Sequence, residues 1–309
     1  MEPPPPPPAT APVRGGSVQD WFSLTKPGIT ALICLVAVGG FLLASPGSVD
    51  LLRLGLVVGT GALASGGSAM LNHYLERESD RRMKRTRERP LAAERIGSST
   101  AAALVGLLLV GLGVGAATWL LNPLTGVSIL LGAVTYVVVY TAWLKPRSSW
   151  NIVIGGFAGS APALAGGAAA VGSWTPGVLA LALLVFLWTP PHFWSLALLL
   201  KEDYARAGLP MLPRMDDLAY SGRVVVVSAA LLVPAAALVG YWGAVVLPVA
   251  LTLVALGLVF VALTAPLWTE VSRRTARRGF IFSGPYLLGV VAALAVNVPL
   301  VHLGLATGF

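Results

Sequence analysis

Apolar residues occupy nine long runs of the chain, which shorter polar segments separate. The runs cover about residues 27–46, 53–75, 99–121, 123–143, 150–171, 176–200, 222–243, 245–268 and 280–303. Each run is close to the ~20 residues that an α-helix needs to cross a bilayer, and membrane-spanning strands are much shorter. The pattern therefore predicts an all-α, polytopic membrane protein whose nine transmembrane helices bundle together.

The composition agrees with a membrane protein. Hydrophobic residues make up 56% of the 309 residues and charged residues only 11%, whereas a soluble domain carries roughly 25% charged residues. Residues 1–20 contain six consecutive prolines and little that could be buried, which is typical of a disordered tail. We therefore expect a Pro-rich tail over residues 1–20 and one transmembrane domain over residues 21–309.

The formal charge of +8 does not indicate nucleic-acid binding, because the charges mark membrane topology. All lysines and arginines except Arg53 lie before the first apolar run or after an even-numbered run. Basic loops stay on the cytoplasmic side of a membrane. The sequence therefore predicts a cytoplasmic N-terminus and an outward C-terminus, in what we expect to be a bacterial inner (plasma) membrane.

A cluster of polar residues follows the second apolar run. Asn72, Glu76 and Asp80 are four residues apart, so they share one stripe of a helix that turns about 100° per residue. Such oxygen donors suit Mg²⁺, which usually bridges one or two carboxylates to substrate phosphates. Basic side chains that could bind phosphate oxygens surround the stripe: Arg77, Arg81, Arg82, Lys84, Arg85 and Arg89. A solvated helix end with a topology signal would explain the arginines but not the register of the three donors.

Two further polar segments lie on the same predicted side. Tyr140 and Lys145 end the fourth run, where they could equally be ordinary interfacial residues. In the sixth run His192 follows Pro190 and Pro191, and an ionisable residue at a helix break is a functional-site hypothesis by default. The alternative is a neutral histidine that bonds a carbonyl freed by the prolines. Lys201 and Asp203 follow in the next loop.

The fifth run contains small residues at helical spacing, including Gly155 and Gly159, and also Pro162. Small residues let membrane helices approach closely, and a proline inside a helix predicts a kink. Close packing is the simpler interpretation of this run, and a bulky substrate lying against bare backbone is the other.

Together these segments resemble the UbiA-type intramembrane prenyltransferases, in the heme-farnesylating form of that family. The matching residues are Asn72, Glu76, Asp80, Met83, Arg85, Thr86 and Arg89–Leu91, then Leu24–Pro27, Tyr140–Lys145, Asn151–Gly156, Pro191–Phe193 and Asp203–Pro213. The resemblance runs over roughly residues 20–305. It implies nine helices around a central cavity, in which farnesyl diphosphate alkylates the 2-vinyl group of heme B. Water addition and diphosphate release then give heme O.

The resemblance also implies roles for particular residues. Mg²⁺ would be held by Asn72, Glu76, Asp80 and Asp203, and the diphosphate by Arg85, Arg89, Lys145 and Lys201, with Tyr140 beside the substrate. His192 would face the heme, either contacting the porphyrin or handling the proton of water addition. Heme B is a substrate here and not a cofactor. Heme A synthase or terminal-oxidase assembly would be candidate partners, besides membrane lipid.

Two departures from the wider family bear on the metal. Many members carry aspartate where this chain has Glu76, and their second loop holds a fuller aspartate motif than Asp203 with Glu202. The number of Mg²⁺ ions is therefore left open. The alternative functions are prenyl transfer to an aromatic quinone precursor, and non-enzymatic membrane transport.

Overall fold

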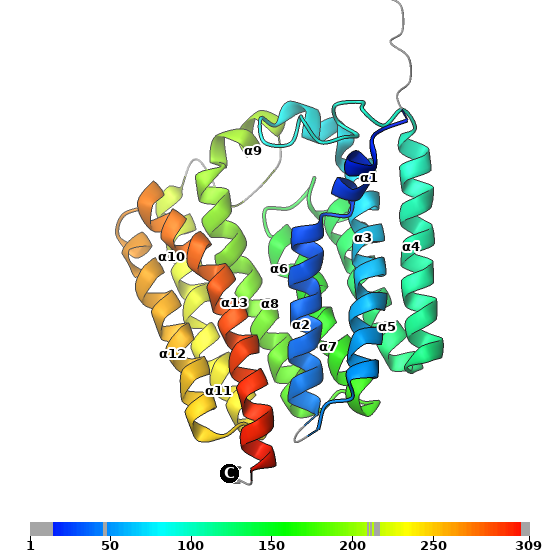
Figure 1. The fold of residues 1–309 in the computed structure, drawn as a ribbon. Coiled ribbons are helices and arrows are strands. Elements are labelled where there is room, and N and C mark those ends of the chain that lie inside the picture. Colours follow the sequence, from blue (N-terminus) through cyan, green and yellow to red (C-terminus); the bar gives the residue numbers. More distant parts are fainter. Residues whose placement is uncertain (1–14, 46–47, 209, 211, 213–216, 304–309) are drawn as a thin grey trace, which may run out of the picture.

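The computed structural model describes residues 15–45, 48–208, 210, 212 and 217–303, which form a bundle of helices (Figure 1). The helices are α1 (Val18–Leu24), α2 (Pro27–Ala44), α3 (Leu51–Arg82), α4 (Ser99–Leu120), α5 (Pro123–Val134), η1 (Thr135–Leu144), α6 (Asn151–Gly155), α7 (Phe157–Val171), α8 (Pro176–Leu199), α9 (Lys201–Ala207), α10 (Leu218–Ala230), α11 (Leu232–Trp242), α12 (Leu247–Thr264), η2 (Ala265–Trp268) and α13 (Arg273–His302).

The described residues contain nine helices that are long and apolar enough to cross a membrane, as the apolar runs predict. They are α2, α3, α4, α5 with η1, α6 with α7, α8, α10 with α11, α12 with η2, and α13. The second span differs most, because α3 continues to Arg82 and carries the polar cluster as an unbroken helix. The chain is thus an all-α, multi-pass membrane protein.

The structure describes residues 15–20, which the sequence analysis placed in the Pro-rich tail. Ser17 caps α1 with a hydrogen bond to the backbone of Asp20, and Gly15 pairs with Ile96 in an isolated bridge. Ordered structure therefore begins before residue 21, because capping and the bond from Arg95 to Asp20 (2.8 Å) hold this segment. The rest of the predicted tail, residues 1–14, lies outside the described residues.

Glycines let neighbouring helices touch. A Cβ atom at Gly40 of α2 would collide with the backbone of Ala163 in α7, and one at Gly67 of α3 with the backbone of Gly106 in α4. In lipid the hydrophobic effect does not drive helices together, so van der Waals packing must. Small residues at the crossings permit this packing because the two backbones can approach closely. These contacts hold α2 against α7 and α3 against α4.

The prolines of the fifth and sixth spans lie inside helices. The fifth span breaks at Gly155–Gly156, between α6 and α7, while Pro162 lies inside α7. Pro190 and Pro191 likewise lie inside α8, which runs on to Leu199. Neighbouring helices can satisfy the carbonyls that proline frees, so these positions do not end the helices.

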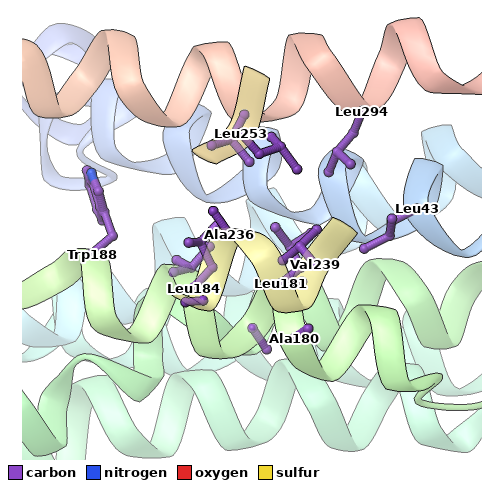
Figure 2. Close-up of a cluster of buried hydrophobic side chains, with 14 of the residues drawn as sticks. Leu43, Ala180, Leu181, Leu184, Trp188, Ala236, Val239, Leu253 and Leu294 are labelled. Atoms are coloured by element: carbon purple, nitrogen blue, oxygen red, sulfur yellow. The ribbon is translucent and has the colours of Figure 1, made fainter. Parts of the chain in front are cut away.

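One half of the bundle is densely packed. Leu181 and Leu184 of α8 lie beside Ala236 and Val239 of α11 in a buried apolar cluster, to which Trp188 of α8 also belongs (Figure 2). Residues of α12 and α13, among them Leu253 and Leu294, complete this cluster. A mainly apolar cavity lies between α2, α3, α5, α7 and α8.

Candidate active site

A cavity of about 390 Å³ lies between α2, α3, α5, η1, α6, α7, α8 and α9. Its polar end is lined by Lys26, Asn72, Glu76, Arg85, Arg89 and Lys145. The other end is lined by apolar side chains, including Ala37, Val57, Ile129 and Ala165. The cavity therefore suits an amphiphile with an anionic head and an apolar chain.

The three donors of the predicted stripe are brought together on α3. Asn72, Glu76 and Asp80 are 2%, 7% and 3% exposed. Buried carboxylates are costly unless they are paired or bind a metal. This burial separates them from Glu78 on the same helix, whose side chain is 64% exposed.

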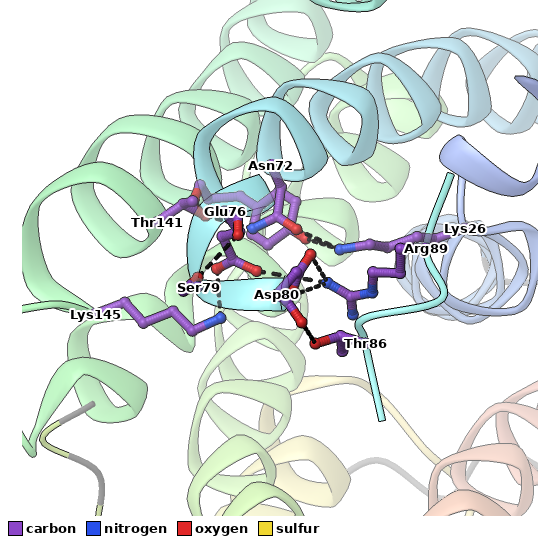
Figure 3. A network of polar contacts seen from close by, with 10 residues as sticks. Lys26, Asn72, Glu76, Ser79, Asp80, Thr86, Arg89, Thr141 and Lys145 are labelled. Atoms are coloured by element: carbon purple, nitrogen blue, oxygen red, sulfur yellow. Dashed lines mark hydrogen bonds and ion pairs between the residues drawn. The ribbon is translucent and has the colours of Figure 1, made fainter. Parts of the chain in front are cut away.

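Basic side chains pair with both carboxylates (Figure 3). Arg89 donates from Nη1 to the two carboxylate oxygens of Asp80, at 2.9 and 2.7 Å, and this atom lies 3.7 Å from Glu76. The ammonium group of Lys145 donates to Glu76. The loop after α3 brings Arg89 back, and Thr86 fixes that loop by donating to the backbone oxygen of Asp80 at 3.1 Å.

Lys26 lies at the polar end, although the sequence analysis counted it only among the topology charges and in the matching segment Leu24–Pro27 and gave it no role at the site. Its ammonium group donates to the side-chain oxygen of Asn72, and to the hydroxyl of Tyr136 at 3.0 Å. Burial lowers the pKa of Lys26 to about 7, against the attraction of Glu76. The signal in the sequence is a lysine directly before the first apolar run, on the same membrane side as the cluster.

A π-helical segment, η1, completes the polar end. Thr141 donates to the backbone oxygen of Tyr136 at 2.8 Å and accepts from the amide of Asn72 at 3.0 Å. Tyr140 of the same segment lines the cavity, and a Cβ atom at Gly155 would collide with its ring. Gly155 and Gly159 both line the cavity, and a Cβ atom at Gly159 would lie 3.5 Å from the hydroxyl of Thr189, so the small residues of the fifth span serve packing.

His192 lines the cavity from α8. Its Nδ1 lies 2.6 Å from the hydroxyl of Ser283 in α13. The imidazole stacks on Trp188 with ring centres 4.5 Å apart, and Phe280 lies on its other flank at 5.3 Å. The polar partner of Nδ1 is thus a serine hydroxyl and not a carbonyl freed by Pro190 and Pro191.

Two predicted residues lie away from this group. Lys201 and Asp203 of α9 line a second cavity of about 400 Å³, together with Lys84 and Arg273. Asp203 is buried, and its neighbour Tyr204 lines the main cavity, where burial raises the pKa of that phenol. In the part of the chain that the structure describes, no three His, Cys, Asp or Glu side chains form a metal-binding group. Asp203 is therefore not assembled with Glu76 and Asp80 here.

The chain matches the model of the UbiA prenyltransferase family over residues 32–284. It is 41% identical to the protoheme IX farnesyltransferase of Sulfurisphaera tokodaii, over 90% of this chain and 92% of the relative. It is 44% identical to the protoheme IX farnesyltransferase of Metallosphaera sedula, over 85% of this chain and 90% of that relative.

Solved structures show the same fold at low sequence identity. A digeranylgeranylglyceryl phosphate synthase superimposes with a TM-score of 0.75 at 18% identity, covering 91% of this chain and 98% of its own. A UbiA homologue from Archaeoglobus fulgidus bound to GPP and Mg²⁺ gives a TM-score of 0.67 at 18% identity, covering 89% and 99%. With the match over most of its length, the chain belongs to the UbiA prenyltransferase family.

Proposed function

We propose that this chain converts heme B to heme O by transferring the farnesyl group of farnesyl diphosphate to the 2-vinyl group, with water addition and diphosphate release. The observation that carries the proposal is the identity of about 40% to protoheme IX farnesyltransferases over 85–90% of the chain. The cavity agrees, because it joins a cationic end to an apolar chamber. The identity to these relatives also disfavours a quinone precursor as acceptor and a transport function.

Mg²⁺ fits the polar end. Asn72, Glu76 and Asp80 offer one amide and two carboxylates from a single buried stripe, and Mg²⁺ binds oxygen ligands and shares them with substrate phosphates. When bound, the ion would stabilise negative charge on the leaving diphosphate. Asp203 lies in α9, and α9 is in contact with α3. Asp203 would become a fourth donor if α9 moved closer to the stripe on α3. Whether Asp203 joins the other donors would decide how many Mg²⁺ ions the site holds.

The cations of the polar end would hold the diphosphate. Arg85, Arg89 and Lys145 line the cavity at this end, and arginine binds phosphate oxygens bidentately. Donors fixed where charge develops lower the barrier to ionisation. Lys26 would act with them, and Lys201 from the neighbouring cavity would guide the diphosphate in or out.

The apolar part of the cavity would hold the farnesyl chain and keep water from the allylic cation. The acceptor heme would lie along the wall that Tyr140, Gly155, Gly159 and His192 line. Ser283 fixes the orientation of the imidazole. His192 would contact the porphyrin or receive the proton of water addition.

The charged loops give the proposed topology. With basic loops in the cytoplasm, the N-terminus and the polar end of the cavity face the cytoplasm, where farnesyl diphosphate is dissolved. The C-terminus then lies outside the cell membrane. The product would pass to heme A synthase or to terminal-oxidase assembly.

The test is an assay with purified protein in detergent or lipid. Heme B, farnesyl diphosphate and Mg²⁺ should give heme O, measured by chromatography of extracted hemes with mass detection. Farnesol in place of the diphosphate should give none, because its leaving group is poor. Unchanged heme B under these conditions, or alkylation of a quinone precursor in its place, would refute the assignment.

A further inference from the structure

Ser68 is a buried serine of α3 that lines the main cavity. It is 3% exposed, and its hydroxyl oxygen has no hydrogen-bond partner among the described residues. Leaving a buried hydroxyl unpaired costs about 1–3 kcal/mol. Ser68 lines the cavity while its hydroxyl oxygen is buried and unpaired, so a rotation of the side chain toward the cavity would let a ligand bond this hydroxyl.

Other hydroxyl side chains of the same cavity are paired. The hydroxyl of Ser65 lies 3.0 Å from the hydroxyl of Thr30. The hydroxyls of Ser128 and Thr189 donate to backbone oxygens of their own helices, those of Leu124 at 2.7 Å and Val185 at 3.1 Å. All three line the cavity with Ser68. The missing partner is thus a property of Ser68 and not of serines in this cavity generally.

The register of α3 places Ser68 beside the reaction. It precedes Asn72 by four residues, and so lies about 6 Å deeper along the stripe that carries Glu76 and Asp80. The carbon C1 of a prenyl diphosphate is bonded to the diphosphate, so it lies just inside the polar end. Ser68 is therefore at the depth of the carbon that reacts, an inference that rests on the proposed function.

The chemistry at that depth requires one water molecule. The bond from C1 to the diphosphate oxygen breaks, and its electron pair leaves with the diphosphate. The vinyl π-electrons form the new bond from the terminal vinyl carbon to C1, which leaves a cation on the vinyl carbon next to the porphyrin ring. Water donates a lone pair to that carbon and loses a proton, either to His192 or to an oxygen of the departed diphosphate. Without a placed water, the cation loses a proton from the adjacent carbon and forms an alkene.

We propose that Ser68 is a positioning residue that holds this water. The serine hydroxyl accepts a hydrogen bond from the water, so that a lone pair of the water oxygen stays free for the cation. Rotation about the Cα–Cβ bond moves the hydroxyl among three staggered positions. The other serine and threonine hydroxyls of the cavity named above are already paired, so this bond would keep one water in place.

The experiment compares Ser68→Ala with Ser65→Ala in the heme assay and measures the ratio of hydrated to dehydrated farnesyl heme. We expect Ser68→Ala to lower this ratio at least about tenfold, because ~1.4 kcal/mol of lost hydrogen bonding corresponds to tenfold. The total rate of farnesylation should change little. Ser65→Ala removes a paired hydroxyl from the same helix and cavity, and should keep the wild-type ratio. Ser68→Thr should keep it too, since the hydroxyl remains.

Several results would overturn the inference: an unchanged ratio in Ser68→Ala, an equal shift in Ser65→Ala, or loss of all farnesylation in a Ser68→Ala protein that is folded. If Ser68→Ala does not fold, Ser68→Thr and Ser68→Cys decide, because cysteine is a poor acceptor and should shift the ratio while threonine should not. Failure of the proposed function would look different, since the wild-type protein itself would then leave heme B unchanged.

Discussion

Replacing Asp80 by asparagine tests the stripe most directly. The carboxylate is 3% exposed and accepts two hydrogen bonds from Arg89, at 2.9 and 2.7 Å. Asparagine has nearly the same shape and keeps one acceptor oxygen, but its NH2 group cannot accept from Arg89, so the change removes the charge and one of the two hydrogen bonds. A structural ion pair and a metal ligand then predict different outcomes.

As a structural pair, Asp80 and Arg89 would lose one charge-assisted hydrogen bond, worth about 1.5–3 kcal/mol of folding free energy. If Asp80 is a metal ligand, its replacement should mainly lower the affinity for Mg²⁺. Replacing even the outer-shell partners of metal ligands lowers metal affinity or activity 10–100-fold. We therefore expect Asp80→Asn to raise the Mg²⁺ concentration for half-maximal heme O formation at least about 100-fold.

The assay is the rate of heme O formation against Mg²⁺ concentration, at saturating farnesyl diphosphate. Glu78→Gln is the matched control, because Glu78 is an exposed carboxylate on the same helix that pairs with Arg81. Arg89→Met removes the same ion pair from the other side. If Arg89→Met and Asp80→Asn lower the rate equally and neither moves the Mg²⁺ midpoint, Asp80 is only a partner of Arg89 and the metal assignment is wrong.

Three further outcomes are expected. Chelation of divalent metal should abolish heme O formation, and added Mg²⁺ should restore it. Ala165→Leu should narrow the apolar end of the cavity. The ratio of kcat/KM for geranyl diphosphate to kcat/KM for farnesyl diphosphate should therefore rise, while the free energy of unfolding falls by about 1–3 kcal/mol. Hydrogen bonds from Arg95 and Ser17 hold the pKa of Asp20 below its ordinary value. That carboxylate stabilises the fold above its unfolded-state pKa, and the effect is lost as the pH falls through the folded-state value. Thermal unfolding in detergent should show the stabilities of wild type and Asp20→Asn converging in acid.

The spans could be predicted because apolar length is a one-dimensional property. The apolar pattern did not predict the end of α3, because this helix continues through the charged segment to Arg82. It also could not reveal the π-helical segment η1, whose hydrogen bonds such as Lys145 to Tyr140 depend on the packed bundle. Such segments are frequent at functional sites, and here Thr141 in η1 contacts Asn72.

The stripe on α3 could be predicted for a similar reason, since residues four apart on one helix share a face in any fold. Contacts between elements are another matter. That Lys26 bonds Asn72, or that Lys145 pairs with Glu76, depends on how α2 and η1 pack against α3. Asp203 shows the opposite case, because a resemblance assigns its role while α9 places it beside another cavity.

The basic side chains of the polar end could exchange their carboxylate partners for phosphate oxygens. Glu76 and Asp80 are paired with Lys145 and Arg89, and Arg85 and Lys26 line the same end. Two carboxylates thus face four basic side chains, which leaves this end of the cavity with an excess of positive charge. A diphosphate carries charge to match that excess, and the cations need only turn from carboxylate to phosphate oxygens to bind it. The freed carboxylates would then be available to Mg²⁺, so that substrate and metal each make the binding of the other more favourable.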